Sequence, residues 1–256
     1  MYAAELQFRI IGDTSYDHAE AAIRCYLEAL IFRGQILGRE FPTALQQDYF
    51  VSRVILPEPD ALLPRHHSPK GLQAMHGLQD AGLSYPKLHI AGVDLMSNHT
   101  DPCEAPEQYI LYCRFAQMNS VLYCAEHFAP VPLYRLSASS DFEDLVRWQL
   151  QYQALDEIQM QEQSVLLKPA ERALQSYGST LNRQGRAFAR SLSKLSGKPV
   201  YYALYRGTSP DCETESSRCC PGCGRNWRLV EPWHDRFDFR CDRCLLVSNI
   251  AWQCQG

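Results

Sequence analysis

The sequence predicts an α+β protein of 256 residues that is built from three consecutive parts. Three observations favour this fold class. The first hundred residues alternate between strand-like and helix-like patterns, residues 141–195 show helical periodicity, and two Cys-x-x-Cys pairs lie near the C-terminus. We expect an α+β part at 1–100, a mixed strand and helical part at 101–206, a linker at 207–218 and a small module at 219–256.

The first hundred residues read as alternating strands and helices. The segment MYAAELQFRII alternates apolar and polar side chains with period two, as a strand with one buried face does. Asp13, Thr14 and Ser15 then offer caps for a helix whose apolar stripe ends at Ile31. Further elements are expected in the strand DYFVSRVILP, the helix KGLQAMHGLQDAGL and the strand KLHIAGVDL. A strand in GREFPTAL, which contains Pro42, would complete the β-α-β-β-α-β order of a ferredoxin-like sandwich.

The middle of the chain begins with strands and continues with helices. We expect strands in QYILYCRF and VLYCAEHF and a loop followed by a strand in APVPLYRL. Three helices are expected, in DFEDLVRWQLQYQALDEIQMQ, around PAERALQSYG and from Leu181 to Leu195. KPVYYALYRG has the Val and Tyr content of a strand. The polar segment GTSPDCETESS has no apolar period and therefore reads as the linker.

The C-terminal module carries four cysteines at the spacing of a structural zinc site. Two Cys-x-x-Cys pairs are separated by 17 residues: Cys220 and Cys223, then Cys241 and Cys244. Pro221 suits a tight turn that aims both sulfurs of the first pair at one ion. Strand-like segments between and after the pairs indicate a zinc ribbon. Four thiolates leave no open coordination position, so we expect one structural Zn²⁺ that replaces the core which so small a module lacks.

Other cysteines and histidines are weaker candidates. Cys124 and His127 form a Cys-x-x-His pair, which is either half of a second metal site completed by Cys113 or Cys103, or a buried cysteine beside a loop histidine. Cys219 could exchange with its neighbour as a ligand, although it does not have the two-residue spacing. The doublet His66-His67 reads as a solvated pair ahead of a helix.

The composition indicates in which cellular environment the protein is expected. The hydrophobic content of 46% and the charged content of 21% are those of a globular protein, with a formal net charge of −4. No run of 18 apolar residues occurs, and the N-terminal segment lacks the basic start and uninterrupted apolar core of a signal peptide. We expect a cytoplasmic protein without membrane contact. In that compartment the eleven cysteines read as metal ligands and thiols, not as disulfides.

A basic helix is the main electrostatic signal. The stretch 172–210 contains seven basic residues and no acidic one. Five of them follow one another along the last predicted helix and just beyond it: Arg183, Arg186, Arg190, Lys194 and Lys198. The first four are three or four residues apart, which places them on one helix face. This stripe either binds a phosphate backbone or another anionic surface, or is solvated or paired with the acidic helix at 141–157.

The sequence contains no catalytic motif that we can identify. A nucleophile elbow, a P-loop, a dinucleotide-binding glycine pattern and an H-E-x-x-H pair are all absent, and no small-molecule substrate is indicated. We therefore expect a protein without enzymatic activity, although an unfamiliar active site stays open. The aromatic side chains of the C-terminal module could stack on bases or form its core: Trp227, Trp233, Phe237 and Phe239.

Several segments together resemble a known family. They are GQILGREFPTAL, the region around His66-His67-Ser68, CAEHFAPVPLYRL, ALDEIQM, VYYALYR, and CPGCGRNW through FDFRCDRCLLVSNIAW. With these the chain resembles a bacterial family of unknown function whose members contain a zinc ribbon and to which nucleic-acid binding is ascribed. The resemblance covers nearly the whole chain. It implies zinc ligation by the four C-terminal cysteines and a metal-binding pair at Cys124 and His127, where relatives often have Cys-x-x-Cys.

The leading functional hypothesis is a zinc-binding module that binds RNA or DNA through the basic helix, with the ribbon assisting. The alternative is an adaptor that docks on a protein of a ribosome- or polymerase-type machine through ribbon aromatics and an exposed sheet edge. Neither pattern fixes the nucleic acid, its sequence or the oligomeric state.

Overall fold

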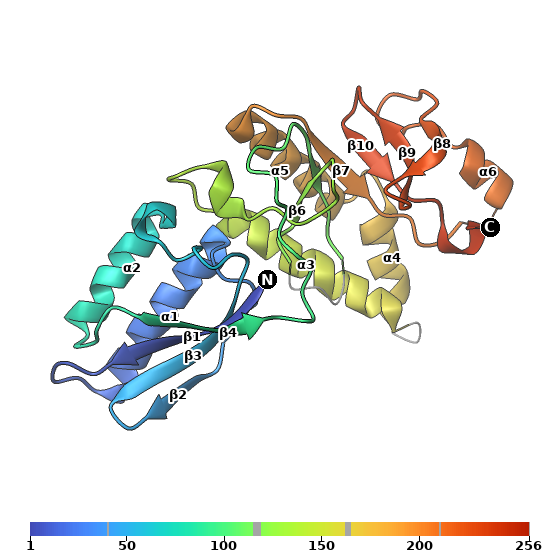
Figure 1. Ribbon diagram of the computed structural model, residues 1–256. Helices are drawn as coiled ribbons and strands as arrows, with labels where there is room; N and C mark the ends of the chain where they lie inside the picture. Colours follow the sequence, from blue (N-terminus) through green and yellow to red (C-terminus); the bar gives the residue numbers. More distant parts are fainter. Residues whose placement is uncertain (40, 115–118, 162–164, 210, 256) are drawn as a thin grey trace. The chain divides into compact units, whose positions relative to one another are not determined.

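The computed structural model describes residues 1–39, 41–114, 119–161, 165–209 and 211–255 (Figure 1). The chain forms two compact units. Unit 1 consists mainly of Met1–Pro102 together with the later segment Ala129–Glu143. Unit 2 contains the chain from Asp144 onward and two short strands that precede it in sequence.

Unit 1 is a four-stranded antiparallel sheet with two helices. Its strands are arranged in the order β2-β3-β1-β4. The elements are β1 (Tyr2–Arg9), α1 (Tyr16–Arg33), β2 (Thr43–Gln46), β3 (Tyr49–Leu56), α2 (Pro69–Asp80) and β4 (Lys87–Val93). This β-α-β-β-α-β order with β1 and β3 in the centre is the split-βαβ arrangement expected from the alternating pattern. The strand expected in GREFPTAL begins directly after Pro42, at the edge of the sheet, where a missing N–H costs nothing.

The core of unit 1 lies between the sheet and the helices. Leu6 and Phe8 of β1 are fully buried, as are Ile23 and Leu30 of α1, and they belong to one apolar cluster. Helix α1 begins at the Ser15 cap, whose Oγ accepts from the N–H of His18, and ends where the next glycine takes a left-handed conformation. The period-two and period-3.6 patterns of the sequence therefore mark the buried faces directly.

The interior of unit 1 also contains polar groups, which corrects one sequence prediction. His67 is 5% exposed and hydrogen-bonds through Nε2 to the hydroxyl of Tyr26, 3.0 Å away. His66 is half-buried against the ring of Tyr134. The doublet precedes α2 as predicted, but it is not solvated, because α1 supplies a buried partner that the local sequence does not indicate.

Unit 2 is built on a six-stranded mixed sheet in the order β6-β5-β7-β10-β9-β8. Its strands are β5 (Tyr109–Leu111), β6 (Leu122–Cys124), β7 (Val200–Leu204), β8 (Arg228–Trp233), β9 (Phe237–Cys241) and β10 (Leu246–Ser248). Its helices are α3 (Glu143–Met160), α4 (Leu167–Gln175), α5 (Thr180–Ser196) and α6 (Cys212–Ser217). The three long helices fall where the sequence predicted them. The expected strand in APVPLYRL, which belongs to unit 1, is instead a 3₁₀ turn at Leu133–Leu136.

The C-terminal hairpin is continuous with the sheet of the middle part. Strand β10 pairs in parallel with β7 and antiparallel with β9, so that Tyr202, Leu246 and Cys241 stand side by side across three strands. The segment 207–218, expected as a linker, contains α6. Helix α6 carries Glu215, a buried carboxylate that pairs with Arg206 and Arg218. Strands β8, β9 and β10 and the strands of the middle part therefore share one sheet.

Helix α5 lies unusually close to this sheet at Gly185. A Cβ built on Gly185 would overlap the ring of Tyr202 and lie 2.7 Å from Cζ2 of Trp148. Asn182, one turn earlier, accepts from the Tyr202 hydroxyl at 2.6 Å and donates to three carbonyls at the end of α4 and just after it. These contacts fix the rotation of α5 and therefore decide which residues of the helix stay outside.

Cys212 of α6 forms a disulfide with Cys254, with the two Cα atoms 5.3 Å apart. The expectation that every cysteine is a thiol or a metal ligand is wrong for this pair, because the fold brings two residues 42 positions apart within bridging distance. Within the described ranges, no helix is long and apolar enough to cross a membrane.

Candidate metal centre

Two turns bring the four predicted cysteines together. Cys220 and Cys223 flank a tight turn ahead of β8, whereas Cys241 ends β9 and Cys244 closes the turn before β10. Their sulfurs all lie within 4.8 Å of one another, and those of Cys223 and Cys241 are 3.7 Å apart. The four sulfurs from these two turns are therefore close enough to hold one metal ion.

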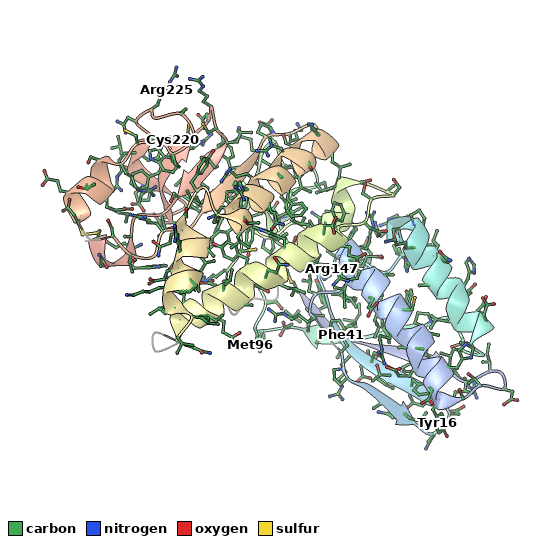
Figure 2. The ribbon with its side chains drawn as sticks, turned by 180° about the vertical axis from the view of Figure 1, so that it is seen from behind. Tyr16, Phe41, Met96, Arg147, Cys220 and Arg225 are labelled. Atoms are coloured by element: carbon green, nitrogen blue, oxygen red, sulfur yellow. A yellow bond between two sulfur atoms is a disulfide. The ribbon has the colours of Figure 1, made fainter. Side chains whose placement is uncertain are left out.

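The backbone of the first turn is shaped for close approach. The N–H of Gly224 donates to the carbonyl of Cys220 and the N–H of Cys220 to the carbonyl of Arg225, both at 2.8 Å. Gly224 has φ of +70°, a left-handed conformation that favours glycine. A Cβ on Gly222 would lie 2.8 Å from the sulfur of Cys244. The glycines of CPGCG thus let the two turns meet (the labelled Cys220 and Arg225 in Figure 2 mark this end of unit 2).

The backbone also acts on the thiols. The N–H of Arg225 donates toward the sulfur of Cys223 and lowers the pKa of that thiol to about 7. Burial raises the pKa of Cys244 to about 12. A bound cation deprotonates a coordinating thiol outright, so a metal in this group would displace protons from the sulfurs.

The other predicted ligands behave differently. Cys219 is exposed and does not belong to the four-sulfur group. Cys124 is buried, with its sulfur 3.8 Å from Nδ1 of His127 and 3.4 Å from the N–H of Glu126. Over the part of the chain that the structure describes, neither Cys103 nor Cys113 joins this pair in a candidate metal group. The pair at Cys124 and His127 therefore remains a prediction without the completing thiols that the sequence suggested.

The basic stripe separates into two kinds of side chain on α5. Arg183, Arg190 and Lys194 are exposed, and Lys198 follows just beyond the Gly197 cap, also exposed. None of these four forms an ion pair within the described residues, and the acidic residues of α3 are not their partners there. Arg186 is half-buried instead, and its guanidinium covers the ring of Tyr177. The sequence did not separate Arg186 from the others.

The aromatic side chains of the C-terminal module are mostly interior. Trp227, Phe237 and Phe239 are 3%, 2% and 0% exposed, and Trp233 is half-buried against the ring of Tyr201. The first three rings therefore serve as core, which was one of the two alternatives open at the level of sequence. They are not available for stacking on bases.

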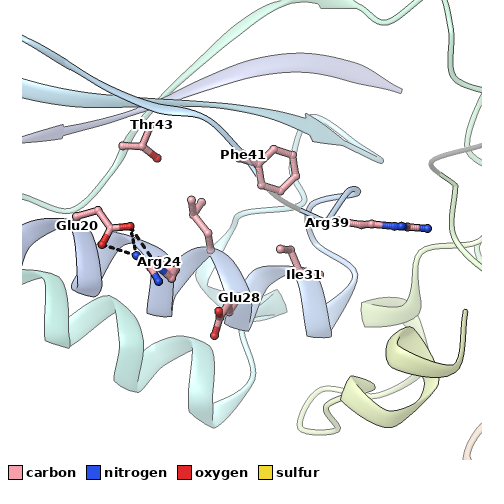
Figure 3. Close-up of a pocket in the computed structure, with 8 residues that line it drawn as sticks. Glu20, Arg24, Glu28, Ile31, Arg39, Phe41 and Thr43 are labelled. Carbon is pink, nitrogen blue, oxygen red and sulfur yellow. Dashed lines mark hydrogen bonds and ion pairs between the residues drawn. The ribbon is translucent and has the colours of Figure 1, made fainter. Parts of the chain in front are cut away.

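A separate pocket of about 400 Å³ lies in unit 1 between α1 and β2 (Figure 3). Leu27, Ile31 and Phe41 form its apolar lining. Its charged residues are of both signs, and Arg24 is paired with Glu20 through short hydrogen bonds. No residue predicted from the sequence as a site lines it.

Comparison with protein families divides the chain into three stretches. Residues 1–92, 103–205 and 210–254 each match a family described as a domain of unknown function, DUF8589, DUF2310 and DUF8594 respectively. The last of these contains the four cysteines. The fold and the site thus define an α+β protein with a four-cysteine candidate metal centre.

Two relatives come from Haemophilus influenzae, and both are uncharacterised proteins. One is 34% identical over 259 residues, which cover 98% of this chain and 99% of the relative. The other is 38% identical over 173 residues, 67% of this chain and 85% of the relative. The chain belongs to the bacterial family of unknown function that these proteins represent.

Among solved structures, a Deinococcus radiodurans protein provisionally named an antibiotic biosynthesis monooxygenase is similar to part of this chain. The match covers 40% of this chain and all of that protein, with 13% identity and a TM-score of 0.28. A likeness this distant carries no argument about activity.

Proposed function

We propose that the protein is a non-enzymatic, zinc-stabilised module that binds RNA or DNA through the exposed basic face of α5. The zinc would be held by the four-sulfur group of unit 2, and the nucleic acid would contact Arg183, Arg190, Lys194 and Lys198. The observation that carries the proposal is that these four cations are exposed and without ion pairs within the described residues. They lie in a stretch of the chain without acidic residues.

The choice of zinc follows from the donor set. Zn–S bonds of about 2.3 Å in a tetrahedral site place neighbouring sulfurs about 3.8 Å apart. The sulfurs of Cys223 and Cys241 are already 3.7 Å apart. A complete set of four thiolates suits a structural zinc and leaves no position for a substrate or water. The ion would tie the turn before β8 to the turn that joins β9 and β10.

The geometry of α5 favours contact with a phosphate backbone. Arg183, Arg190 and Lys194 are separated by seven and four residues, which returns each side chain to nearly the same side of the helix. With a rise of about 1.5 Å per residue, the three span roughly 16 Å along the axis. The exposed residues between them are small or uncharged, including Ala187 and Ser191. A face of this kind can contact the charged phosphates, but it presents no aromatic ring that could stack on bases.

The proposal predicts a defined salt dependence. Four phosphate contacts give a slope of log binding constant against log salt of about −3.6 on duplex DNA and about −2.8 on a single strand. Between 50 and 200 mM salt the affinity for duplex DNA should therefore fall roughly a hundredfold. Little discrimination between sequences is expected, because the contacts are to the backbone.

The test is a titration of zinc-loaded protein into labelled single-stranded RNA and duplex DNA at both salt concentrations. The double variant Arg190→Glu, Lys194→Glu should weaken binding strongly and lower the salt slope by about 2. Its matched control reverses Lys87 and Lys168, two exposed lysines outside α5, with the same change in net charge. If both double variants lost the same nucleic-acid affinity, the loss would be due to net charge and not to the α5 surface. Unchanged binding in the α5 variant would rule out this surface.

The alternative of a protein-docking adaptor is favoured by a different feature. Strand β8 is an edge of the six-stranded sheet, and Val230 on it is fully exposed. Between Arg228 and Trp233 the pairing with β9 shifts, so part of this strand bulges from the ladder. A partner captured at high salt after nuclease treatment, and lost in Val230→Asp, would support docking at this edge. Retention of the partner by Val230→Asp would exclude it.

A further inference from the structure

The first turn of the cysteine site touches the segment that leads into α5. A Cβ on Gly222 would lie 3.2 Å from the hydroxyl oxygen of Tyr177, as well as 2.8 Å from the sulfur of Cys244. Tyr177 belongs to the short connection between α4 and α5. The turn, the sulfur of a candidate ligand and the tyrosine hydroxyl therefore meet at one place, which has no room for a methyl group.

Arg186 holds the same tyrosine from the side of the helix. Its guanidinium carbon is 3.6 Å from the centroid of the Tyr177 ring, a cation–π distance. Its Nη1 also donates to the carbonyl oxygen of Tyr177 at 2.6 Å. Arg186 therefore makes both a cation–π contact and a hydrogen bond to Tyr177. Its guanidinium is held within unit 2, whereas the neighbouring Arg183 and Arg190 are exposed.

The start of α5 is tied rigidly to this connection. Ser179 caps the helix by accepting from the N–H of Asn182 at 3.1 Å, and its hydroxyl donates to the carbonyl of Ala173 at 2.7 Å. Asn182 itself donates to the carbonyl of Ser176 at 2.8 Å. A displacement of Tyr177 would therefore be passed to the first turn of α5, and with it to Arg183 and the cations that follow.

A second connection runs through the sheet. Cys241 stands in register with Leu246, and Leu246 with Tyr202, whose ring lies against Gly185 of α5. The metal ligands and the basic helix are thus joined both at the Gly222 turn and across three strands. This arrangement is a contiguous packed network within unit 2.

We propose that Tyr177 and Arg186 are positioning residues that couple the cysteine site to α5, so that metal occupancy sets the placement of the nucleic-acid-binding cations. The inference rests on the proposed function in its last step, whereas the coupling between metal and helix is a property of the free protein. Without the ion the sulfurs of the two turns lose the metal–sulfur bonds that would join the turns directly. The Gly222 turn then loosens and releases Tyr177, and the first turns of α5 open more often.

The test is hydrogen exchange of the free protein, read over residues 180–190, with the cysteine site loaded or stripped by a chelator. In the wild type, removal of the metal should speed exchange in this segment by about tenfold or more. In the loaded protein, Arg186→Gln should produce much of the same increase, because Tyr177 loses its stacked partner. Arg190→Gln is the matched control on the same helix and should leave exchange unchanged.

A second readout separates a positioning role from a structural one. Loading with Co²⁺ should give the spectrum of a tetrahedral thiolate site in Arg186→Gln and in Tyr177→Phe, which shows that the site still forms. Arg186→Gln should weaken nucleic-acid binding without lowering the salt slope, since this residue makes no phosphate contact. Arg190→Gln should lower the slope by about 0.9. Tyr177→Phe keeps the ring and removes only the hydroxyl, so it tests the contact with the turn without removing the core of the connection.

The outcomes distinguish the two proposals. Equal exchange of α5 in loaded wild type and loaded Arg186→Gln would overturn the coupling, even if nucleic acid binds. Exchange that responds to metal and to Arg186→Gln in a protein that binds no nucleic acid would support the coupling and refute the proposed function. A drop in salt slope in Arg186→Gln equal to that in Arg190→Gln would show that Arg186 contacts phosphate directly, and would overturn its positioning role.

Discussion

Replacing Gly185 by alanine tests the close packing that fixes the orientation of α5. Alanine is the better helix former, and a Gly→Ala change inside a helix ordinarily stabilises by about 1 kcal/mol. At this position the added methyl would overlap the ring of Tyr202 and lie 2.7 Å from Cζ2 of Trp148. Both rings are buried, at 1% and 3% exposure, so neither can swing into solvent.

The two effects have opposite signs, and the steric one should be larger. An added methyl group in a well-packed core typically lowers the free energy of unfolding by about 1–3 kcal/mol. Because this methyl would meet two rigid rings, we expect a cost in the upper part of that range. After the helix-propensity gain, we expect Gly185→Ala to lower the free energy of unfolding of unit 2 by about 1–2 kcal/mol. Displacement of α5 should also weaken nucleic-acid binding.

The assay is denaturant unfolding followed by tryptophan fluorescence. All four tryptophans of the chain lie in unit 2, so this signal reports the unit that contains Gly185. The matched control is Gly77→Ala in α2 of unit 1, where a Cβ meets nothing within 4 Å. That variant should stabilise unit 1 by up to about 1 kcal/mol, measured by circular dichroism. A Gly185→Ala protein as stable as the wild type would refute the packing argument.

Two further predictions concern buried polar groups. Glu215→Ala removes a carboxylate that is 1% exposed and that pairs with Arg206 and Arg218. In denaturant unfolding it should lower the free energy of unfolding of unit 2 by about 3 kcal/mol, and a loss below about 0.5 kcal/mol would contradict a buried ion pair. Burial lowers the pKa of His67 below its ordinary value near 6.5, so the unfolded chain takes up the proton first and unit 1 should lose stability as the pH falls below about 6.5. His67→Gln should flatten that decline in a pH series of thermal melts, and an equally steep decline in the variant would assign it to other groups.

Local patterns predict the elements of this protein well. In unit 1 the alternation of β1 and the apolar stripe of α1 identify their buried faces, and Pro42 marks the start of an edge strand. In unit 2 the spacing of the four cysteines predicts their convergence, because two tight turns bring the four sulfurs within 4.8 Å of one another. These features depend on residues that are neighbours in the sequence.

Long-range contacts account for what the sequence did not indicate. The parallel pairing of β10 with β7, the burial of His67 against Tyr26, and the Cys212–Cys254 bridge all join residues about 40 positions apart. No local period encodes such partners. For the same reason the basic stripe read as five equivalent cations, although Arg186 differs from the rest through its contact with Tyr177.

The most direct test of the account is the metal content of the purified protein, measured by elemental analysis together with unfolding of unit 2. We predict one tightly bound zinc per chain in the wild type. Cys223→Ser, Cys244→Ser should retain none and should unfold unit 2 at lower denaturant, whereas the exposed Cys219→Ser should keep its zinc. A second equivalent of metal lost in Cys124→Ser would support the predicted pair with His127. Wild-type protein that contains no metal, or iron in place of zinc, would contradict the central claim.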